Sequence, residues 1–369
     1  MKILVLQDYL RSGGTERQSV LMARAFRGSG HTVQVVTFRP GGALADTLGE
    51  VPHHALQRFD MHLDWYAPGL RTMVEQFGPD VVLCMGRMAN CRASEVQRYL
   101  AREYSDKVVV ATMRTGKSLP WLFRRSLRMV RHVVANSDEA RRILVDRYHV
   151  PLEKISVIRN ALVFAPPVET GPGRISDRSQ SVRNELGARP GSIVLLWVGM
   201  FRPEKNQRGI IQIVAQLPPE IDWQLWFAGE GPEKASCQAL VNKLGIGDRV
   251  HFFGFRADPT SLYTAADIAV LTSRSESLSN FLIEAHAHGM PSVGYGVTGV
   301  VECGGRVVAP EDQAAFMEEL LPFLRVPEFR RREGDRLAAH AREHFSPVAQ
   351  AAAYLELFRR LRESLPPTG

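Results

Sequence analysis

The stretch IVLLWVGMFRPEKNQ, residues 193–207, joins an unbroken apolar run to a polar loop that contains one glycine. The run 193–198 predicts a strand buried on both faces, as in a parallel sheet. The loop carries Arg202 and Lys205 and leads into an apolar-periodic stretch that predicts a helix. Strand, loop and helix in this order form the repeating unit of a parallel α/β fold.

The same alternation runs through the whole chain of 369 residues. Predicted strands lie at 2–6, 33–38, 81–85, 108–112 and 132–135, and a second series lies at 193–198, 224–228, 250–253 and 268–271. Because the series restarts after a break, we expect two doubly wound domains and not one large sheet.

The break is PPVETGPGRISDRSQS, residues 166–181, which is rich in Pro, Gly and Ser, as linkers are. We therefore predict an N-terminal domain over 1–165 and a C-terminal domain over 182–346. Residues 347–369 predict a final helix with apolar residues at helical spacing, and we expect it to pack back towards the N-terminal domain.

Charge is unevenly distributed between the halves. The net charge is +7, but residues 1–165 hold 24 Lys+Arg and 15 Asp+Glu, whereas residues 166–369 hold 22 and 24. The four cysteines form no CxxC pair, which favours reduced thiols in the cytoplasm over disulfides or a zinc site. The apolar run in MKILVLQDY is too short for a signal peptide, so a cytoplasmic protein is expected.

Two loops at predicted strand ends are candidate phosphate sites. RSGGTERQ, residues 11–18, contains Gly13 and Gly14 ahead of a predicted helix, whose N-terminus favours anions. Arg202 and Lys205 in the loop 197–207 are placed to grip a diphosphate. An ordinary turn and a solvated basic loop, respectively, are the alternative interpretations.

The stretch SRSESLSNFLIEAHAHG, residues 273–289, is the most informative. Ser279 or Asn280 can cap a helix that ends before Gly289. Glu276 precedes the cap, and Glu284 lies eight residues later among apolar neighbours. An unpaired, enclosed carboxylate is costly, so Glu284 is expected to bind ligand hydroxyls; a surface carboxylate on an amphipathic helix is the alternative. The glycine turns AGEGP (228–232) and FFGF (252–255) complete the pattern.

Taken together, these motifs resemble the retaining glycosyltransferases of family 4, also called group 1, which have the GT-B fold. Glu276 and Glu284 match the E-x7-E element of that family, and VGMFRPEKN matches its phosphate loop. ANSDEARR and VPLEKISVIRNA, within 135–161, resemble the segment that closes its first domain. The resemblance implies an α/β fold of two Rossmann-like domains facing a central cleft.

The resemblance also implies roles for individual residues. Donor-binding positions would be Gly14, Gly199, Arg202, Lys205, Gly229, Phe255, Arg256, Glu276, Ser279, Asn280, Phe281 and Glu284. Lys205 would contact the diphosphate, Glu284 the ribose, and Glu276 the hydroxyls of the transferred sugar. The amides around 279–281 would meet the distal phosphate, and Phe255 and Arg256 would lie near the base, with UDP as the expected nucleotide.

Two positions depart from the family pattern. Met200 stands where members usually have Arg, and we expect Arg202 to reach a similar point. Arg114 stands where many members have His. The predicted catalytic set is Glu276, Lys205, Arg202 and Arg114, without a cofactor, and without a metal because the chain has no DxD pair. Preorganised donors would stabilise the leaving diphosphate during front-face attack by the acceptor.

The acceptor is expected to be a glycan or lipid-linked molecule in cell-surface polysaccharide or glycolipid synthesis. Residues 114–131, RTGKSLPWLFRRSLRMVR, hold six Lys/Arg and no acid, with Trp121 and Leu122 among them. Such a stretch favours the inner face of the plasma membrane, although a helix covering the sheet is the alternative. No nucleic-acid motif is present.

Two other functions remain open from the sequence. A nucleotide-sugar 2-epimerase uses a related two-domain fold. A non-catalytic nucleotide-sugar-binding subunit would accommodate Met200 and Arg114.

Overall fold

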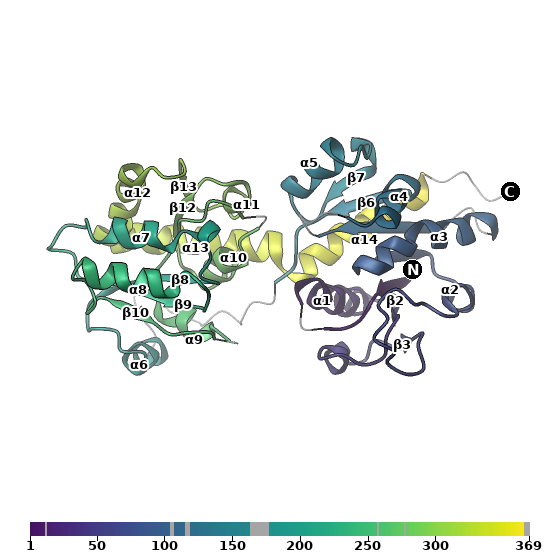
Figure 1. Ribbon diagram of the computed structural model, residues 1–369, viewed down its shortest axis with the longest axis horizontal. Helices are drawn as coiled ribbons and strands as arrows, with labels where there is room; N and C mark the ends of the chain where they lie inside the picture. Colours follow the sequence, from purple (N-terminus) through teal and green to yellow (C-terminus); the bar gives the residue numbers. More distant parts are fainter. Residues whose placement is uncertain are drawn as a thin grey trace. The chain divides into compact units, whose positions relative to one another are not determined.

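The computed structural model describes residues 1–11, 13–103, 107–114, 119–162, 177–256, 258–276 and 278–364. The chain divides into two compact units, each built on its own sheet (Figure 1). The first unit combines Met1–Ala161 with Phe345–Gly369, and the second is Leu162–His344. No helix within the described ranges has both the length and the apolar character needed to cross a bilayer.

The sheet of the first unit has seven parallel strands in the order β3-β2-β1-β4-β5-β6-β7. The strands are β1 (Lys2–Gln7), β2 (Thr32–Thr37), β3 (His53–Ala55), β4 (Val81–Cys84), β5 (Val108–Met113), β6 (His132–Ala135) and β7 (Ile155–Val157). The strand order reverses beside β1, so the carboxyl ends of β1 and β4 lie together, which is where open α/β sheets bind ligands.

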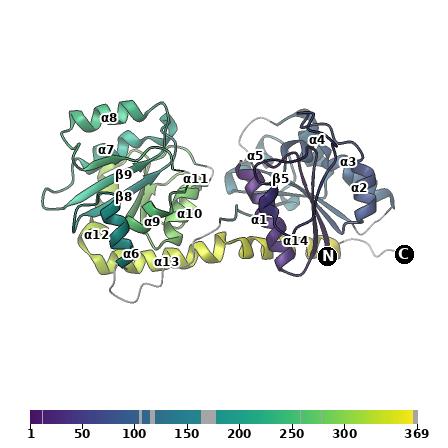
Figure 2. The same cartoon turned by 90° about the horizontal axis from the view of Figure 1, so that it is seen from below.

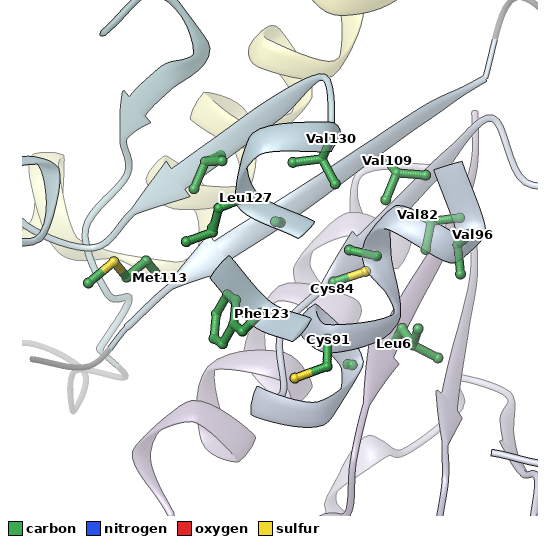
Figure 3. Close-up of a cluster of buried hydrophobic side chains, with 14 of the residues drawn as sticks. Leu6, Val82, Cys84, Cys91, Val96, Val109, Met113, Phe123, Leu127 and Val130 are labelled. Atoms are coloured by element: carbon green, nitrogen blue, oxygen red, sulfur yellow. The ribbon is translucent and has the colours of Figure 1, made fainter. Parts of the chain in front are cut away.

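Helices cover both faces of this sheet. One face carries α1 (Gly14–Gly28), the short helix η1 (Ala45–Leu48) and α14 (Pro347–Glu363). The other carries α2 (Leu70–Phe77), α3 (Arg87–Glu103), α4 (Trp121–Met129) and α5 (Asp138–Asp146), while η2 (Leu152–Lys154) precedes β7. Figure 3 shows part of the core beneath α3 and α4, in which Phe123 and Leu127 belong to the same buried cluster as Cys84 and Val109.

The C-terminal segment belongs to the first unit. Tyr354 and Phe358 of α14 pack against Phe26 of α1, with ring centroids 6.0 and 5.8 Å apart. The hydroxyl of Ser346 caps α14 by accepting from the amide of Ala349. These buried aromatic contacts attach a helix that the sequence separates from α1 by more than 300 residues.

The second unit has six parallel strands in the order β10-β9-β8-β11-β12-β13. The strands are β8 (Ile193–Val198), β9 (Trp223–Ala228), β10 (Val250–Phe252), β11 (Ile268–Leu271), β12 (Ser292–Tyr295) and β13 (Arg306–Val308). The helices are α6 (Asp177–Glu185), η3 (Pro203–Lys205), α7 (Gln207–Val214), α8 (Lys234–Lys243), α9 (Thr260–Ala265), α10 (Asn280–Ala287), α11 (Thr298–Val301), α12 (Gln313–Arg325) and α13 (Pro327–Phe345).

All nine predicted strands lie in these two sheets, and the doubly wound class is confirmed. Four strands escaped prediction: β3, β7, β12 and β13. Three of them have only three residues, and β12 contains Gly294, so none presents a sustained β-branched run.

The predicted linker differs from the structure at its C-terminal end. Residues 166–176 lie outside the described residues, but 177–181 form the start of α6. Arg183 of α6 donates to the carbonyl of Ala265 at 2.6 Å and to Asp267 at 3.0 Å. This tertiary anchor, which composition does not reveal, holds a polar segment helical.

Candidate functional site

The loop after β8 is pinned to the sheet by Phe201. The Phe201 side chain is fully buried among Trp197, Phe227 and Phe252, and its amide donates to the carbonyl of Glu230 at 3.0 Å. The next turn, η3, therefore starts from a rigid point. Met200, immediately before Phe201, has an exposed side chain.

The glycine turns bring neighbouring strand ends into backbone contact. A Cβ on Gly229 would lie 1.8 Å from the carbonyl oxygen of Gly199, and one on Gly231 would lie 2.3 Å from that of Phe201. Both residues also have positive φ angles, 145° and 152°. Any side chain at either position would push the phosphate loop out of place. Gly199 and Gly229 thus act in the structure by allowing β8 and β9 to approach closely.

Lys205 and Glu276 meet in an ion pair. The ammonium nitrogen of Lys205 lies 2.6 Å from Oε1 of Glu276, and the hydroxyl of Ser273 donates to the same oxygen at 2.8 Å. The Glu276 side chain is 9% exposed and that of Lys205 is 25% exposed. The two predicted residues, 71 positions apart, therefore form one polar cluster beside the loop.

The N-terminus of α10 follows this cluster. Ser279 is its N-cap and accepts from the amide of Leu282, and Gly289 adopts the left-handed conformation just past its end, as predicted. The amide of Gly299 donates to the carbonyl of Glu276, which ties the turn before the cap to α11. Amides in the first turn, such as those of Asn280 and Phe281, have no intrahelical acceptor and can bind an anion.

Glu284 has a partner that the sequence did not reveal. The hydroxyl of Tyr263 donates to Oε2 of Glu284 at 2.6 Å. Burial, and then the Glu284 charge, raises the pKa of Tyr263 well above its usual range, so its hydroxyl stays a donor. The expectation of an unpaired carboxylate is wrong, because Tyr263 of α9 reaches across from a neighbouring helix. Glu284 itself is half-buried.

The remaining predicted donor residues are exposed. Phe255 is 75% exposed, and the Arg256 guanidinium lies over the ring of Phe253. Arg202 lies 3.8 Å from Glu204 and lines a hollow of about 340 Å³ together with residues of α7 and α8, and Lys205 is not part of that lining. In this conformation Arg202 does not join the cluster formed by Lys205 and Glu276.

The first unit has a polar pocket of about 260 Å³ at the carboxyl ends of β1, β4 and β5. It is lined by Gln7, Asp8, Arg11, Thr15, Glu16, Met85, Gly86, Arg87, Asn90, Thr112, Arg114 and Phe123. Gly14 begins α1 beside this pocket. Of the predicted residues, only Arg114 lines it directly.

Arg114 is held in place from two distant segments. Its guanidinium donates to Oδ1 of Asn160, and to the Tyr354 hydroxyl of α14 at 2.8 Å. Its buried Nε has no hydrogen-bond partner within the described part of the chain. The same holds for Oε1 of Gln7, whose side chain is fully buried. Two residues that line the pocket therefore each hold one buried polar atom without a partner in the described residues.

Asp8 is a site residue that sequence analysis missed. Its carboxylate accepts from the amides of Met88 and Ala89 at 2.9 and 2.6 Å, at the start of α3. Burial raises the pKa of Asp8 to about 6 despite these amides. Its position directly after β1 is the signal that identifies it, since strand ends in open sheets face the ligand.

The basic stretch 114–131 is partly helical. Residues 115–118 lie outside the described residues, and α4 buries Phe123 and Leu127 against the sheet. Trp121, Leu122 and Met129 are exposed beside four arginines. The alternative prediction, a helix covering the sheet, is thus correct for Leu127. The predicted membrane contact rests on the exposed apolar residues of α4.

All four cysteines are buried free thiols. Among the residues that the structure describes, no cluster of three His, Cys, Asp or Glu side chains could hold a metal ion.

Two family models match the chain. "Glycosyl transferases group 1" covers residues 179–338, and "Glycosyltransferase Family 4" covers residues 12–163. Together they span most of both units.

Curated relatives match over part of their length. N-acetyl-alpha-D-glucosaminyl L-malate synthase of Bacillus anthracis is 29% identical over 182 residues, 48% of each chain. D-inositol 3-phosphate glycosyltransferase 2 of Catenulispora acidiphila is 31% identical over 251 residues, 63% of this chain and 57% of the relative. The chain spans about half the length of the curated relatives it matches.

Solved structures match over nearly the whole chain. Anabaena Alr3699/HepE, in complex with UDP and glucose, has a TM-score of 0.70 at 21% identity and covers 97% of this chain and 99% of its own. A glycosyltransferase from Rickettsia africae has a TM-score of 0.78 at 18% identity, covering 98% and 99%. At these identities the likeness shows the fold, which confirms the predicted pair of Rossmann-like domains of GT-B type.

Proposed function

This chain belongs to the group 1 glycosyltransferases, and on that basis we propose that it transfers a sugar from a nucleotide diphosphate sugar to a glycan or lipid-linked acceptor. The observation that carries the proposal is the cluster of Lys205 and Glu276 at the N-terminus of α10. A cation, a carboxylate and free helix amides at one strand end match the needs of a sugar diphosphate.

In this proposal the second unit binds the donor. The ribose hydroxyls would bond to Glu284, which Tyr263 orients, and the base would lie on the exposed ring of Phe255 near Arg256. UDP is our expected nucleotide. Similar solved structures, in which another protein is in complex with UDP or UDP-glucose, support this choice.

The proposed reaction retains anomeric configuration and needs no metal. Charge that builds on the leaving diphosphate would be stabilised by Lys205 and by the amides of Asn280 and Phe281. Arg202 would have to swing from Glu204 to take the place that Met200 leaves empty. The acceptor would attack from the front face, with the leaving phosphate taking its proton.

The first unit would bind the acceptor in its own pocket, which Arg114 lines. We place the enzyme in the cytoplasm, in the synthesis of cell-surface polysaccharide or glycolipid. The exposed Trp121 and Leu122 of α4, set among arginines, support a peripheral contact with the inner membrane.

The alternatives now have unequal weight. Matches to glycosyltransferase families in both units do not favour the epimerase. A non-catalytic nucleotide-sugar-binding subunit remains the competing function, because Met200 is exposed where a cation would be expected.

The test is a thermal-shift screen against UDP, GDP and ADP, with and without sugars, in the presence of EDTA. We expect one nucleotide to stabilise the protein, and Lys205→Ala and Glu284→Ala to abolish that shift. Leu152→Ser, an exposed position before β7, is the control that should keep it. A shift that appears only when EDTA is replaced by a divalent cation would overturn the metal-free donor site. Binding without turnover on any acceptor would favour the non-catalytic subunit.

A further inference from the structure

The segment between β3 and α2 exposes four large apolar side chains. Phe59 is 71% exposed, Met61 and Trp65 are each 54% exposed, and Tyr66 is 38% exposed. They fall within eight residues of sequence. We call residues 57–66 the aromatic loop. Contiguous exposed apolar residues mark interaction sites, because water disfavours them.

Buried polar contacts hold the aromatic loop in shape. The Arg39 guanidinium, largely buried, bonds to both carboxylate oxygens of Asp60 at 2.7 and 2.9 Å and to Asp64 at 2.7 Å. The side-chain amide of Gln57 donates from Nε2 to the carbonyls of Leu63 and Tyr66. The contacts from Arg39 and those within the loop fix its backbone, so the exposure of its apolar side chains belongs to the folded state and does not result from fraying.

The aromatic loop adjoins the helical face that includes α4. Arg92 of α3 donates to the carbonyl of Trp65 at 3.2 Å, and α3 packs along α4 through Ser94 and Ser126. Figure 2 shows α2, α3 and α4 along one side of the first unit, opposite α1 and α14. On α4, which packs along α3, the side chains of Trp121, Leu122 and Met129 are also exposed.

The charge of this face is positive. Exposed arginines on it are Arg58, Arg87, Arg98, Arg124, Arg125, Arg128 and Arg131. Several carboxylates near these arginines are in ion pairs: Asp60 and Asp64 with Arg39, Glu75 of α2 with Arg71, and Glu95 of α3 with Arg92. Aromatic side chains among arginines fit the headgroup layer of an anionic bilayer better than a neutral surface.

We propose that the aromatic loop inserts Phe59, Met61 and Trp65 into an anionic lipid surface while the arginines of α3 and α4 bind its phosphates. The first unit thereby contacts lipid at two points, and Tyr66 lies at the headgroup level. This inference specifies the proposed membrane contact. Its biological role, access to a lipid-linked acceptor, rests on the proposed function.

Tryptophan fluorescence can test the insertion directly. Trp197, Trp223 and Trp226 are buried in the second unit, so Trp121→Phe leaves Trp65 as the exposed tryptophan. With vesicles of phosphatidylglycerol and phosphatidylcholine carrying brominated acyl chains, we expect the emission of Trp121→Phe to shift to the blue and to be quenched. Vesicles of phosphatidylcholine alone should quench it at least tenfold less at equal lipid. Absence of quenching with anionic vesicles would overturn the insertion.

Flotation with the same vesicles gives the matched comparison. Phe59→Ser combined with Met61→Ser should weaken binding to anionic vesicles at least tenfold, since each removes an apolar side chain from the lipid. Leu152→Ser, exposed to a similar degree, should not change it. Equal flotation of both variants would contradict the proposal. A nucleotide-induced thermal shift shows that each variant is folded, independently of lipid. If the protein binds vesicles but no nucleotide, the proposed transferase function fails while the lipid proposal stands.

A protein partner is the competing occupant. Sedimentation velocity without lipid tests one such partner, a second copy of the chain. A concentration-dependent dimer that Phe59→Ser and Met61→Ser dissociate, together with no vesicle binding, would overturn the lipid assignment.

Discussion

The polar groups of the two units are satisfied in different ways. In the second unit, Lys205 and Glu276 already bond to each other, and Glu284 already accepts from Tyr263. In the first unit, Oε1 of Gln7 and Nε of Arg114 lack partners within the described residues. The charged residues predicted for the donor site are thus already paired, although Oε1 of Gln207 beside the phosphate loop has no partner in the described residues, whereas two residues lining the first-unit pocket each hold such an atom.

This difference indicates which interactions could contribute to ligand affinity and selectivity in each unit. A ligand of the second unit must share or displace an existing ion pair, so its gain comes from its own negative charge near Lys205 and the helix amides. A ligand that reached these atoms of Gln7 or Arg114 would satisfy buried groups that have no partner in the described residues, which would favour ligands with matching donors and acceptors over those without. The hydroxyl-rich acceptor that we propose would meet that requirement.

The largest expected effect comes from breaking the ion pair. Lys205→Met removes a cation from the leaving diphosphate and leaves the Glu276 charge uncompensated. We expect the turnover rate to fall about 10²–10³-fold, the usual loss for a preorganised donor. Release of nucleotide from the donor that passes the binding screen measures it.

Lys107→Met provides the control for that experiment. Lys107 also forms an ion pair with a partly buried carboxylate, that of Asp80 at 3.4 Å, but in the first unit. Its removal should leave turnover within a factor of two. A comparable loss in both variants would mean that the effect of Lys205 arises from stability and not from the site.

The stability of the second unit should depend on acid pH in its own way, because that unit contains a buried histidine. His286 of α10 is fully buried, and burial, with His340 and Arg336 nearby, lowers its pKa to about 3. Below pH 6.5 the unfolded chain takes up a proton that the folded unit refuses, so stability falls as pH drops from 6.5 towards 3. Between pH 7 and 5 the second unit should lose about 2 kcal/mol through this group.

His286→Gln removes that titration and retains a group able to bond to Ser292, the partner of His286 at 2.8 Å. The variant should show an unfolding free energy about 2 kcal/mol less sensitive to pH over the same range. Urea unfolding followed by tryptophan emission reports this unit, because Trp197, Trp223 and Trp226 lie in it. Parallel pH profiles for variant and wild type would contradict the assignment.

Local patterns in the sequence were enough to predict most of the fold. The buried runs of β1, β8 and β11 and the Ser279 cap of α10 are encoded within a few residues, and each prediction is confirmed. Short strands such as β13 and the polar helix α6 depend on tertiary contacts, so periodicity misses them.

The candidate site was only partly predictable for the same reason. Glu276 and Glu284 are recognisable by spacing, and Lys205 by its loop, but their partners come from elsewhere in the chain. Tyr263 lies 21 residues from Glu284, and Tyr354 lies 240 residues from Arg114. Sequence spacing does not reveal which side chain faces which across helices, and the roles of these residues stay predictions until measured.

A smaller effect, on nucleotide affinity, is expected from removing the hydrogen bond that Tyr263 donates to Glu284. Tyr263→Phe removes the hydroxyl that donates to Glu284 at 2.6 Å, and we expect the dissociation constant of the nucleotide to rise about tenfold. Tyr295→Phe is the matched control, because the buried hydroxyl of Tyr295 has no partner within the described residues. Isothermal titration calorimetry measures both. Equal affinities for the two variants would show that Tyr263 does not orient the donor site.

The smallest expected effect is on the pH dependence of stability and comes from Asp8, a buried carboxyl group that lines the first-unit pocket. Its pKa is raised from 3.8 to about 6 by burial, so its contribution to stability is complete below pH 3.8 and is lost as pH rises through 6. This direction is opposite to that of His286. Asp8→Asn should remove the dependence, and the wild type should lose about 1 kcal/mol relative to the variant between pH 5 and 8.

The amide of Asn at position 8 cannot accept from both Met88 and Ala89, so the variant starts with one unsatisfied amide. The pH slope, and not the absolute stability, therefore carries the test. A variant that gains relative stability with rising pH but loses turnover would mean that the first unit keeps an ionisable carboxylate for its ligand at the expense of stability. A flat difference between the two proteins would mean that Asp8 only caps α3, and ligand binding in the pocket would then depend on its other polar residues, Gln7 and Arg114 among them.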